Sequence, residues 1–204
     1  PKRVGELLHA IEDYKGMPIT RAALQLAPLV FVRPGELRKA EWIEFDLDAK
    51  QWRIQGARMK RTKQENLSGA AHVVPLPRQA IAILRDLEPL TGHGRYIFPS
   101  PRTGERPMSD NGVLSALRSM GFPKDEMTGH GFRAMARTLL AEQLGIDEAV
   151  IEAQLAHAVK DALGRAYNRT EFLEQRRRML QTWADYLDKL REGAEVIPLK
   201  RNRS

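Results

Sequence analysis

The sequence contains no cysteine among its 204 residues, which excludes disulfides, zinc–cysteine sites and thiol nucleophiles. It also lacks any run of 18 apolar residues, so no segment has the composition of a membrane-spanning helix. No signal peptide is visible at the start. Because the first residue is Pro1 rather than methionine, we expect a processed chain or a piece excised from a longer protein.

Positive charge is in excess. Lysine and arginine total 33 against 26 aspartate and glutamate residues, which gives a net charge of +7 and an isoelectric point near 9.9. The apolar fraction of 42% is ordinary, and the chain is long enough to bury a core without cross-links. The excess of cations favours a polyanionic partner, most often a nucleic acid.

The spacing of apolar residues predicts a mainly helical chain. Helices are expected over about residues 4–14, 19–31, 36–40, 77–90, 113–120, 130–144, 147–155 and 170–191. Ser109 and Asp110 are expected to cap the helix at 113–120. Alternating patterns predict strands over 42–46, 51–54 and 72–76. The fold class is therefore α+β, mainly α-helical, with a small three-stranded antiparallel sheet against a helical core.

Two segments have no helical period. Residues 56–71 are basic and polar, and we interpret them as a strand end and a hairpin loop. Residues 193–204 follow the last helix and combine the apolar run 196–199 with three cations. We expect one domain over residues 1–192, with 193–204 as a C-terminal tail.

Six polar residues stand out by their surroundings: Arg33, Lys60, His130, Arg133, His157 and Tyr167. Taken singly, each has an ordinary structural explanation, such as a solvated charge, a basic strand edge, a local ion pair or a packed ring. Taken in order, with separations of 27, 70, 3, 24 and 10 positions, they resemble the catalytic set of the tyrosine recombinases, also called phage integrases.

The flanking sequences support this resemblance, which spans roughly residues 5–190. Similar segments are 31–37 around Arg-Pro-Gly-Glu, 58–60, 72–77, 128–133 around His-x-x-Arg, 155–157, 166–169 and 183–188. One departure is that Thr128 and Gly129 precede His130, where many members have Leu-Arg. Full-length integrases also carry N-terminal DNA-binding domains, and none is present here, so the chain resembles the catalytic domain alone.

The resemblance implies an enzyme that cleaves and rejoins DNA through a 3′-phosphotyrosine intermediate. Tyr167 would be the nucleophile. Arg33 and Arg133 would bind the charge that develops on the attacked phosphate, because a guanidinium offers a planar fork that matches phosphate. Lys60, in the basic hairpin, would protonate the leaving 5′ oxygen.

The remaining roles are also implied by the resemblance. His130 would assist proton transfer or hold the phosphate, His157 would hydrogen-bond a phosphate oxygen, and Glu36 would orient Arg33. Neither a metal nor another cofactor is expected. In agreement, the sequence has no phosphate-binding Gly-Lys-Ser/Thr loop and no carboxylate cluster spaced for two metals.

Several residues carry secondary or alternative interpretations. Arg38, Arg58, Arg61 and Lys63 are expected to contact DNA, and Lys63 remains an alternative to Lys60. The arginines at 176–178 are interpreted as a solvated or DNA-facing stretch, and His72 as structural. Tyr14, Tyr96 and Tyr186 are alternative nucleophiles by residue type only, and Tyr186 is expected to pack in the last helix.

The implied function is the integration or excision of a prophage or genomic island in the bacterial cytosol. The implied partners are double-stranded DNA attachment sites, further copies of the chain in a homotetramer on DNA, and accessory DNA-bending proteins; no membrane contact is expected. The tail at 193–204 is either a docking segment for a neighbouring copy or a simple chain end. Two alternatives stay open, a non-cleaving DNA-binding module derived from an integrase and a relaxase of the type IB topoisomerase kind.

Overall fold

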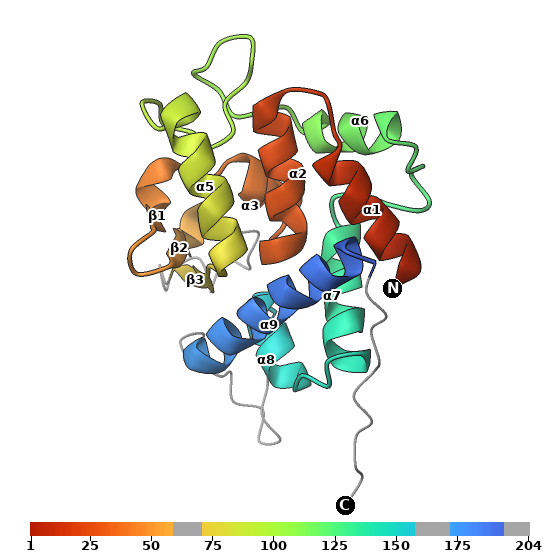
Figure 1. The fold of residues 1–204 in the computed structure, drawn as a ribbon. Coiled ribbons are helices and arrows are strands. Elements are labelled where there is room, and N and C mark those ends of the chain that lie inside the picture. Colours follow the sequence, from red (N-terminus) through yellow and green to blue (C-terminus); the bar gives the residue numbers. More distant parts are fainter. Residues whose placement is uncertain (59–70, 158–171, 194–204) are drawn as a thin grey trace, which may run out of the picture.

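The computed structural model describes residues 1–58, 71–157 and 172–193 (Figure 1). Within these ranges the helices are α1 (Lys2–Glu12), α2 (Pro18–Val30), α3 (Pro34–Arg38), α5 (Arg78–Thr91), α6 (Gly112–Ser119), α7 (Gly131–Glu142), α8 (Glu148–Gln154) and α9 (Leu173–Arg191). Helix α2 lies at the centre, with α1, α5, α6, α7 and α9 packed around it. Most of its residues are buried, as expected for a helix that is apolar on nearly every side.

The sheet is small and antiparallel. Its strands are β1 (Phe45–Asp46), β2 (Gln51–Ile54) and β3 (His72–Pro75), in the order β1-β2-β3. Trp52 in the middle strand pairs with Phe45 on one side and with Val74 on the other, and its ring stacks on Phe45. Trp52 and Ile54 are fully buried while Arg53 between them is exposed, which is the alternation of a strand with one face on the core. The predicted fold class is confirmed.

The strand predicted over 42–46 is wrong in its first half. Trp42–Glu44 forms a short 3-10 helix, η1, and only Phe45–Asp46 is a strand. Alternation would have placed Ile43 inward, yet Ile43 is 91% exposed and Glu44 is buried. The reason is tertiary: the Glu44 carboxylate accepts a hydrogen bond from the buried Trp52 indole at 3.0 Å, so the polar residue faces the core.

The C-terminal end of α2 is a junction between four helices. The last carbonyls of any helix lack partners within that helix. Here side chains from three other helices donate to carbonyls near the end of α2. Trp183 of α9 donates to Pro28 at 2.8 Å, Gln154 of α8 to Val30 at 3.4 Å, and Arg133 of α7 to Phe31 at 2.9 Å. The segment that follows α2 is therefore held in place by α7, α8 and α9 together.

Arg176 corrects the prediction that the arginines at 176–178 are solvated or face DNA. Arg176 is fully buried, whereas Arg177 is half-buried and Arg178 is exposed. Its guanidinium donates to the Gln154 side chain at 2.8 and 3.0 Å and to the Val73 carbonyl. Burial lowers the pKa of Arg176 to about 10. This side chain joins α9 to α8 and to β3, so it has a structural place in the core.

Other expected boundaries need smaller corrections. The expected cap of α6 is wrong, because the N-cap residue is Asn111 with no side-chain cap bond, and Asp110 pairs with Arg38 instead. Helix α7 ends at Glu142 rather than 144. Helix α9 begins at Leu173, and 170–171 lie outside the described ranges. His72 is buried with its Nε2 on the Gln154 carbonyl at 3.1 Å, and Tyr186 stacks on Trp183, as expected.

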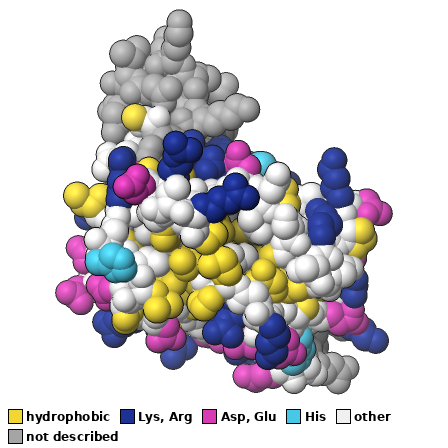
Figure 2. Space-filling view, turned by 90° about the horizontal axis from the view of Figure 1, so that it is seen from above, with side chains coloured by type: hydrophobic (Ala, Val, Ile, Leu, Met, Phe, Trp, Pro, Cys, Tyr) yellow, Lys and Arg dark blue, Asp and Glu magenta, His cyan; other side chains and the backbone are white. Residues whose placement is uncertain are grey.

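The surface carries charge of both signs. Figure 2 shows the molecule from above, where hydrophobic side chains gather in the middle of the face and lysine and arginine side chains lie around them. None of the helices in the described ranges combines the length and the apolar composition needed to cross a bilayer.

Candidate active site

The structure describes part of the predicted site. The predicted residues within the described ranges are Arg33, Glu36, Arg38, His130, Arg133 and His157. Lys60, Arg61, Lys63 and Tyr167 lie outside those ranges, and Arg58 ends the short 3-10 helix η2 (Gly56–Arg58) with only its backbone described. The described site is formed by the junction of α2 and α3, the first turns of α7 and the end of α8.

Arg33 is held at the start of α3 by Glu36. Pro34 occupies the first helical position, where its missing N–H is not needed, and Arg33 is the N-cap residue. One Glu36 oxygen accepts the Arg33 backbone N–H at 2.9 Å and the other accepts the guanidinium Nη1 at 3.0 Å. The Glu36 side chain is only 5% exposed and that of Arg33 24%. The guanidinium is therefore fixed by a buried carboxylate while part of it still faces solvent.

Arg133 lies on the first turn of α7 and is 9% exposed. Its Nη1 donates to the Phe31 carbonyl and its Nη2 to the Leu155 carbonyl, both at 2.9 Å. These carbonyls lie at the C-terminal ends of α2 and α8, where helix dipoles favour a cation. Two helix ends thus hold one planar guanidinium.

Burial and a neighbouring cation oppose the charge that the two helix ends favour. Burial, followed by the nearby positive charge of Arg33, lowers the pKa of Arg133, and the carboxylates of Glu36 and Glu152 act in the opposite direction. Arg33 and Arg133 are thus close enough to repel each other. An anion bound between them would relieve that repulsion.

His157 is positioned by the turn that ends α8. Its backbone N–H bonds to the Glu152 carbonyl at 3.1 Å, and the N–H of Ala156 bonds to Ala153 at 3.2 Å. Ala156 has a left-handed backbone with φ of 55°. This pair of bonds around a left-handed residue is the Schellman motif. The chain reverses at Leu155 and Ala156, which brings the His157 ring back beside α7.

The Schellman turn leads to a stability prediction at Ala156. Glycine adopts the left-handed conformation without the penalty of about 1–2 kcal/mol that a Cβ brings, although it loses about 0.5–1 kcal/mol more entropy on folding. Ala156→Gly is therefore expected to raise the free energy of unfolding by about 0.5–1 kcal/mol in urea denaturation. Ala153→Gly, inside the same helix, is expected to lower it by about 1 kcal/mol. A less stable Ala156→Gly protein would contradict this account of the turn.

The His157 ring bonds to two charged partners. Its Nδ1 lies 2.5 Å from the Glu152 carboxylate, and its Nε2 lies 3.3 Å from the Arg133 guanidinium. Burial by itself raises the pKa of Glu152, but hydrogen bonds from Arg137 and His157 lower it below the usual value. Neither Glu152 nor Arg137 was predicted from the sequence. The 3.6-residue period places Arg137 on the same face of α7 as Arg133, and Glu152 on the same face of α8 as Glu148. Only the packing of the two helices shows that these faces are in contact.

His130 and Arg38 lie to one side of this cluster. His130 is the exposed N-cap residue of α7, so the helix begins at Gly131, one residue later than expected. Both side chains line a cavity of about 560 Å³. Arg38 pairs with the Asp110 carboxylate and donates to the Met108 carbonyl at 3.1 Å. Arg38, expected to contact DNA, thus already has two partners within the chain.

The arrangement suits anion binding better than metal binding. Over residues 1–58, 71–157 and 172–193, no three histidine, aspartate or glutamate side chains are grouped to hold a metal ion. The two carboxylates of the cluster, Glu36 and Glu152, are each engaged by an arginine. The groups left facing the site are two guanidiniums, which are donors for an oxyanion, and the His157 imidazole.

Comparison with known proteins identifies similar chains. A family model, that of the phage integrase family, matches residues 1–174. The integrase of Enterobacteria phage P4 is 41% identical over 199 residues, which are 91% of this chain and 44% of that integrase. The prophage integrase IntA of Escherichia coli (strain K12) is 38% identical over 197 residues, 97% of this chain and 46% of IntA. The chain spans about half the length of the curated relatives it matches.

A solved structure agrees in fold. The integrase from mycobacterium phage Brujita superposes with a TM-score of 0.62 at 17% sequence identity, over 84% of this chain and 54% of that one. At this identity the likeness concerns the arrangement of helices and strands alone.

Proposed function

Because this chain belongs to the phage integrase family, we propose that it acts in site-specific recombination and integrates or excises a prophage or genomic island. It cleaves and rejoins DNA through a 3′-phosphotyrosine intermediate. The observation that carries the proposal is the pair of fixed guanidiniums, Arg33 on Glu36 and Arg133 on two helix-end carbonyls, with His157 beside them.

Two fixed guanidiniums fit the transition state of phosphoryl transfer. As a nucleophile attacks the phosphorus, negative charge develops on the non-bridging oxygens, and donors already in place need no reorganisation to meet it. Arg33 and Arg133 bind these oxygens, and the His157 ring, protonated on both nitrogens in this complex, donates its Nε2–H to one of them while Nδ1–H stays on Glu152. The positive charge of Arg33 lowers the pKa of Arg133, and a phosphate bound to both cations offsets the repulsion between them.

The chemical steps follow from the family resemblance. The Tyr167 hydroxyl oxygen forms a bond to the phosphorus and the bond to the 5′ oxygen breaks. The tyrosine proton passes to His130, and Lys60 protonates the leaving oxygen. Rejoining is the reverse attack by a 5′-hydroxyl on the phosphotyrosine. Because the covalent intermediate keeps the energy of the broken bond, the reaction needs neither ATP nor a metal.

The proposal extends to the assembly. Residues 1–192 form the catalytic domain, and four copies assemble on two duplex attachment sites in the bacterial cytosol, with accessory DNA-bending proteins. Arg38, Arg58, Arg61 and Lys63 contact the DNA backbone. The tail 193–204, of which 194–204 lies outside the described residues, docks onto a neighbouring copy.

Covalent trapping tests the proposal. The chain is mixed at low salt with a nicked duplex that carries the attachment site, in the presence of EDTA, and denatured. We expect a protein–DNA adduct from the wild type and none from Tyr167→Phe, because phenylalanine has no oxygen to attack the phosphorus. Low salt is needed because DNA affinity falls steeply with ionic strength. Equal DNA affinity of the two proteins serves as the control.

Each other outcome points to a different conclusion. An adduct that persists in Tyr167→Phe would assign the nucleophile to another tyrosine. DNA binding without an adduct from either protein would favour the non-cleaving module. Adducts that form equally on unrelated duplexes would favour a relaxase of the topoisomerase kind over a site-specific recombinase.

A further inference from the structure

Four charged or titratable side chains are joined by successive contacts that lead from the molecular surface to the candidate site. Arg133 and Arg137 lie one turn apart on α7, and Glu152 lies on the facing helix α8, five residues before His157. Arg137 Nε donates to one Glu152 oxygen at 2.6 Å, and the other Glu152 oxygen lies 2.5 Å from His157 Nδ1. The last contact joins His157 Nε2 to Arg133 Nη2 at 3.3 Å.

The partners of the His157 ring determine which nitrogen carries the proton. A guanidinium can only donate, so Nε2 accepts from Arg133 and has a free lone pair for that bond. An ionised carboxylate can only accept, so Nδ1 carries the proton and donates it to Glu152. Both contacts select the same tautomer, in which Nε2 faces the guanidinium at the site.

We propose that Glu152 is a positioning residue that holds the His157 ring, with its proton on Nδ1, for the reaction at the phosphate. This inference rests on the proposed function, because that function places His157 at the phosphate. A carboxylate behind a histidine restrains both the ring orientation and the tautomer, as in the outer partners of metal-bound histidines. Arg137 restrains Glu152 in turn, from the side away from the site.

A simple surface ion pair does not account for these contacts. The Arg137 side chain is 52% exposed and its second partner, Glu148, is 75% exposed, so that pair alone is worth little. Glu152 differs, because its side chain is only 18% exposed and its second oxygen faces His157 rather than solvent. Its backbone carbonyl also holds the His157 N–H. Glu152 therefore contacts His157 through both its main chain and its side chain.

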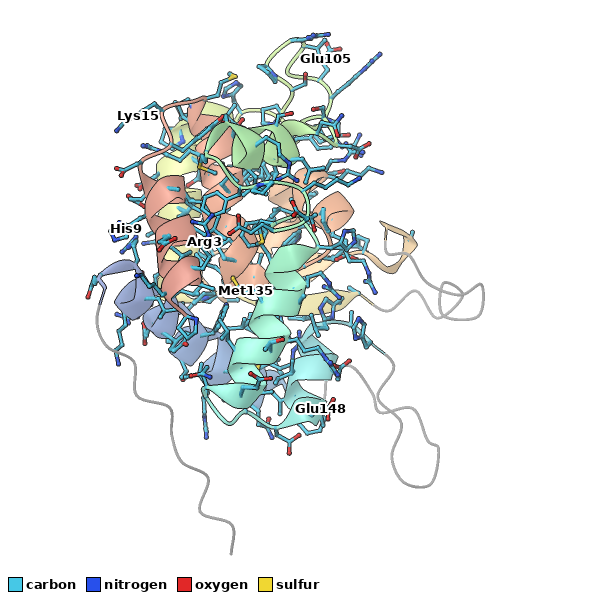
Figure 3. The ribbon with its side chains drawn as sticks, turned by 90° about the vertical axis from the view of Figure 1, so that its right-hand side faces the viewer. Arg3, His9, Lys15, Glu105, Met135 and Glu148 are labelled. Atoms are coloured by element: carbon cyan, nitrogen blue, oxygen red, sulfur yellow. The ribbon has the colours of Figure 1, made fainter. Side chains whose placement is uncertain are left out.

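Glu148 provides a matched control. It lies one turn before Glu152 on α8 and accepts from the same Arg137 at 2.8 Å, but among the described residues no hydrogen bond or ion pair joins it to His157. Figure 3 labels it on α8 at the lower edge of the molecule. Glu148→Ala removes a carboxylate from the same network without touching His157.

The first measurement needs no DNA. Long-range proton–nitrogen NMR spectra report which nitrogen of neutral His157 is protonated. We expect the proton on Nδ1 in the wild type and in Glu148→Ala, and a shift toward Nε2 in Glu152→Ala. Glu152→Gln keeps an acceptor oxygen and is expected to retain the Nδ1 proton. Thermal unfolding of each variant checks that the fold is intact.

The second measurement is single-turnover cleavage of the nicked attachment-site duplex. At saturating DNA, Glu152→Ala is expected to cleave about tenfold more slowly, within the range typical of outer partners that orient a histidine. Its DNA dissociation constant is expected to stay unchanged, and Glu152→Gln to recover part of the rate. Glu148→Ala is expected to match the wild type.

Several results would overturn the inference. It fails if the His157 spectrum is the same in Glu152→Ala as in the wild type, or if the rate is unchanged although the tautomer shifts. It also fails if Glu148→Ala slows cleavage equally. If the wild type itself forms no adduct, the proposed function fails, and the spectra still decide whether Glu152 holds the ring.

Discussion

The Arg133→Lys variant is expected to cleave attachment-site DNA about 10²- to 10³-fold more slowly than the wild type, the usual effect of losing one fixed donor to a developing oxyanion. The two Nη nitrogens of Arg133 each donate to one backbone carbonyl, Nη1 to Phe31 and Nη2 to Leu155. A lysine ammonium is a compact point charge, so it cannot bond both carbonyls and still present a planar edge to phosphate. The substitution keeps a basic side chain and removes the planar fork, so it tests whether the guanidinium geometry is needed.

Single-turnover formation of the covalent adduct measures this effect. Arg118→Lys is the matched control, because the Arg118 guanidinium also donates to two backbone carbonyls, those of Phe122 and Met127, and within the described ranges it has no hydrogen bond to Arg33, Arg133 or His157. Both variants are expected to lose some stability, but only Arg133→Lys is expected to lose the reaction. A rate for Arg133→Lys within about threefold of the wild type would show that charge alone suffices at this position.

The fold could be predicted from the sequence where periodicity and burial agree. The middle strand, Gln51–Ile54, has the predicted bounds, and α2 and α5 lie within one residue of theirs. Prediction failed where a polar side chain is buried by a specific partner. Glu44 faces inward because Trp52 donates to it, and Arg176 is buried because Gln154 and Val73 accept from it. Residue type suggests the surface in both cases, and only packing shows the partner.

The site was predictable to the extent that its contacts are local. Glu36 lies three residues after Arg33, so a helical turn is enough to bring the two side chains together. Arg133 and His157 were selected as site residues by their order in the chain, but that order did not indicate their partners. The carbonyls of Phe31 and Leu155 have no sequence signal, since every residue has a carbonyl. Glu152 contacts His157 only because α8 ends in a Schellman turn around a left-handed alanine.

The largest expected loss of stability comes from Trp183→Ala. Trp183 is fully buried, its ring packs edge-on against Phe31 at 6.3 Å and stacks on Tyr186 at 5.8 Å between ring centroids. Its indole N–H donates to the Pro28 carbonyl at 2.8 Å. Truncating a buried tryptophan to alanine typically costs about 3–5 kcal/mol through lost burial and the cavity that remains. We expect a loss of that size in the free energy of unfolding, measured by urea denaturation.

The position of Trp183 connects this loss to the site. Its partners Pro28 and Phe31 belong to the end of α2, and the Phe31 carbonyl is one of the two that hold Arg133. Trp183→Phe keeps a large ring but leaves the buried Pro28 carbonyl without its donor, which costs about 1–3 kcal/mol. Ile43→Ala, at a side chain that is 91% exposed, is the control and is expected to stay within about 0.5 kcal/mol of the wild type. A loss of unfolding free energy below about 1 kcal/mol for Trp183→Ala would contradict the packing described for this side chain. Slow cleavage by a stable, folded Trp183→Phe protein would show that the end of α2 also supports the reaction.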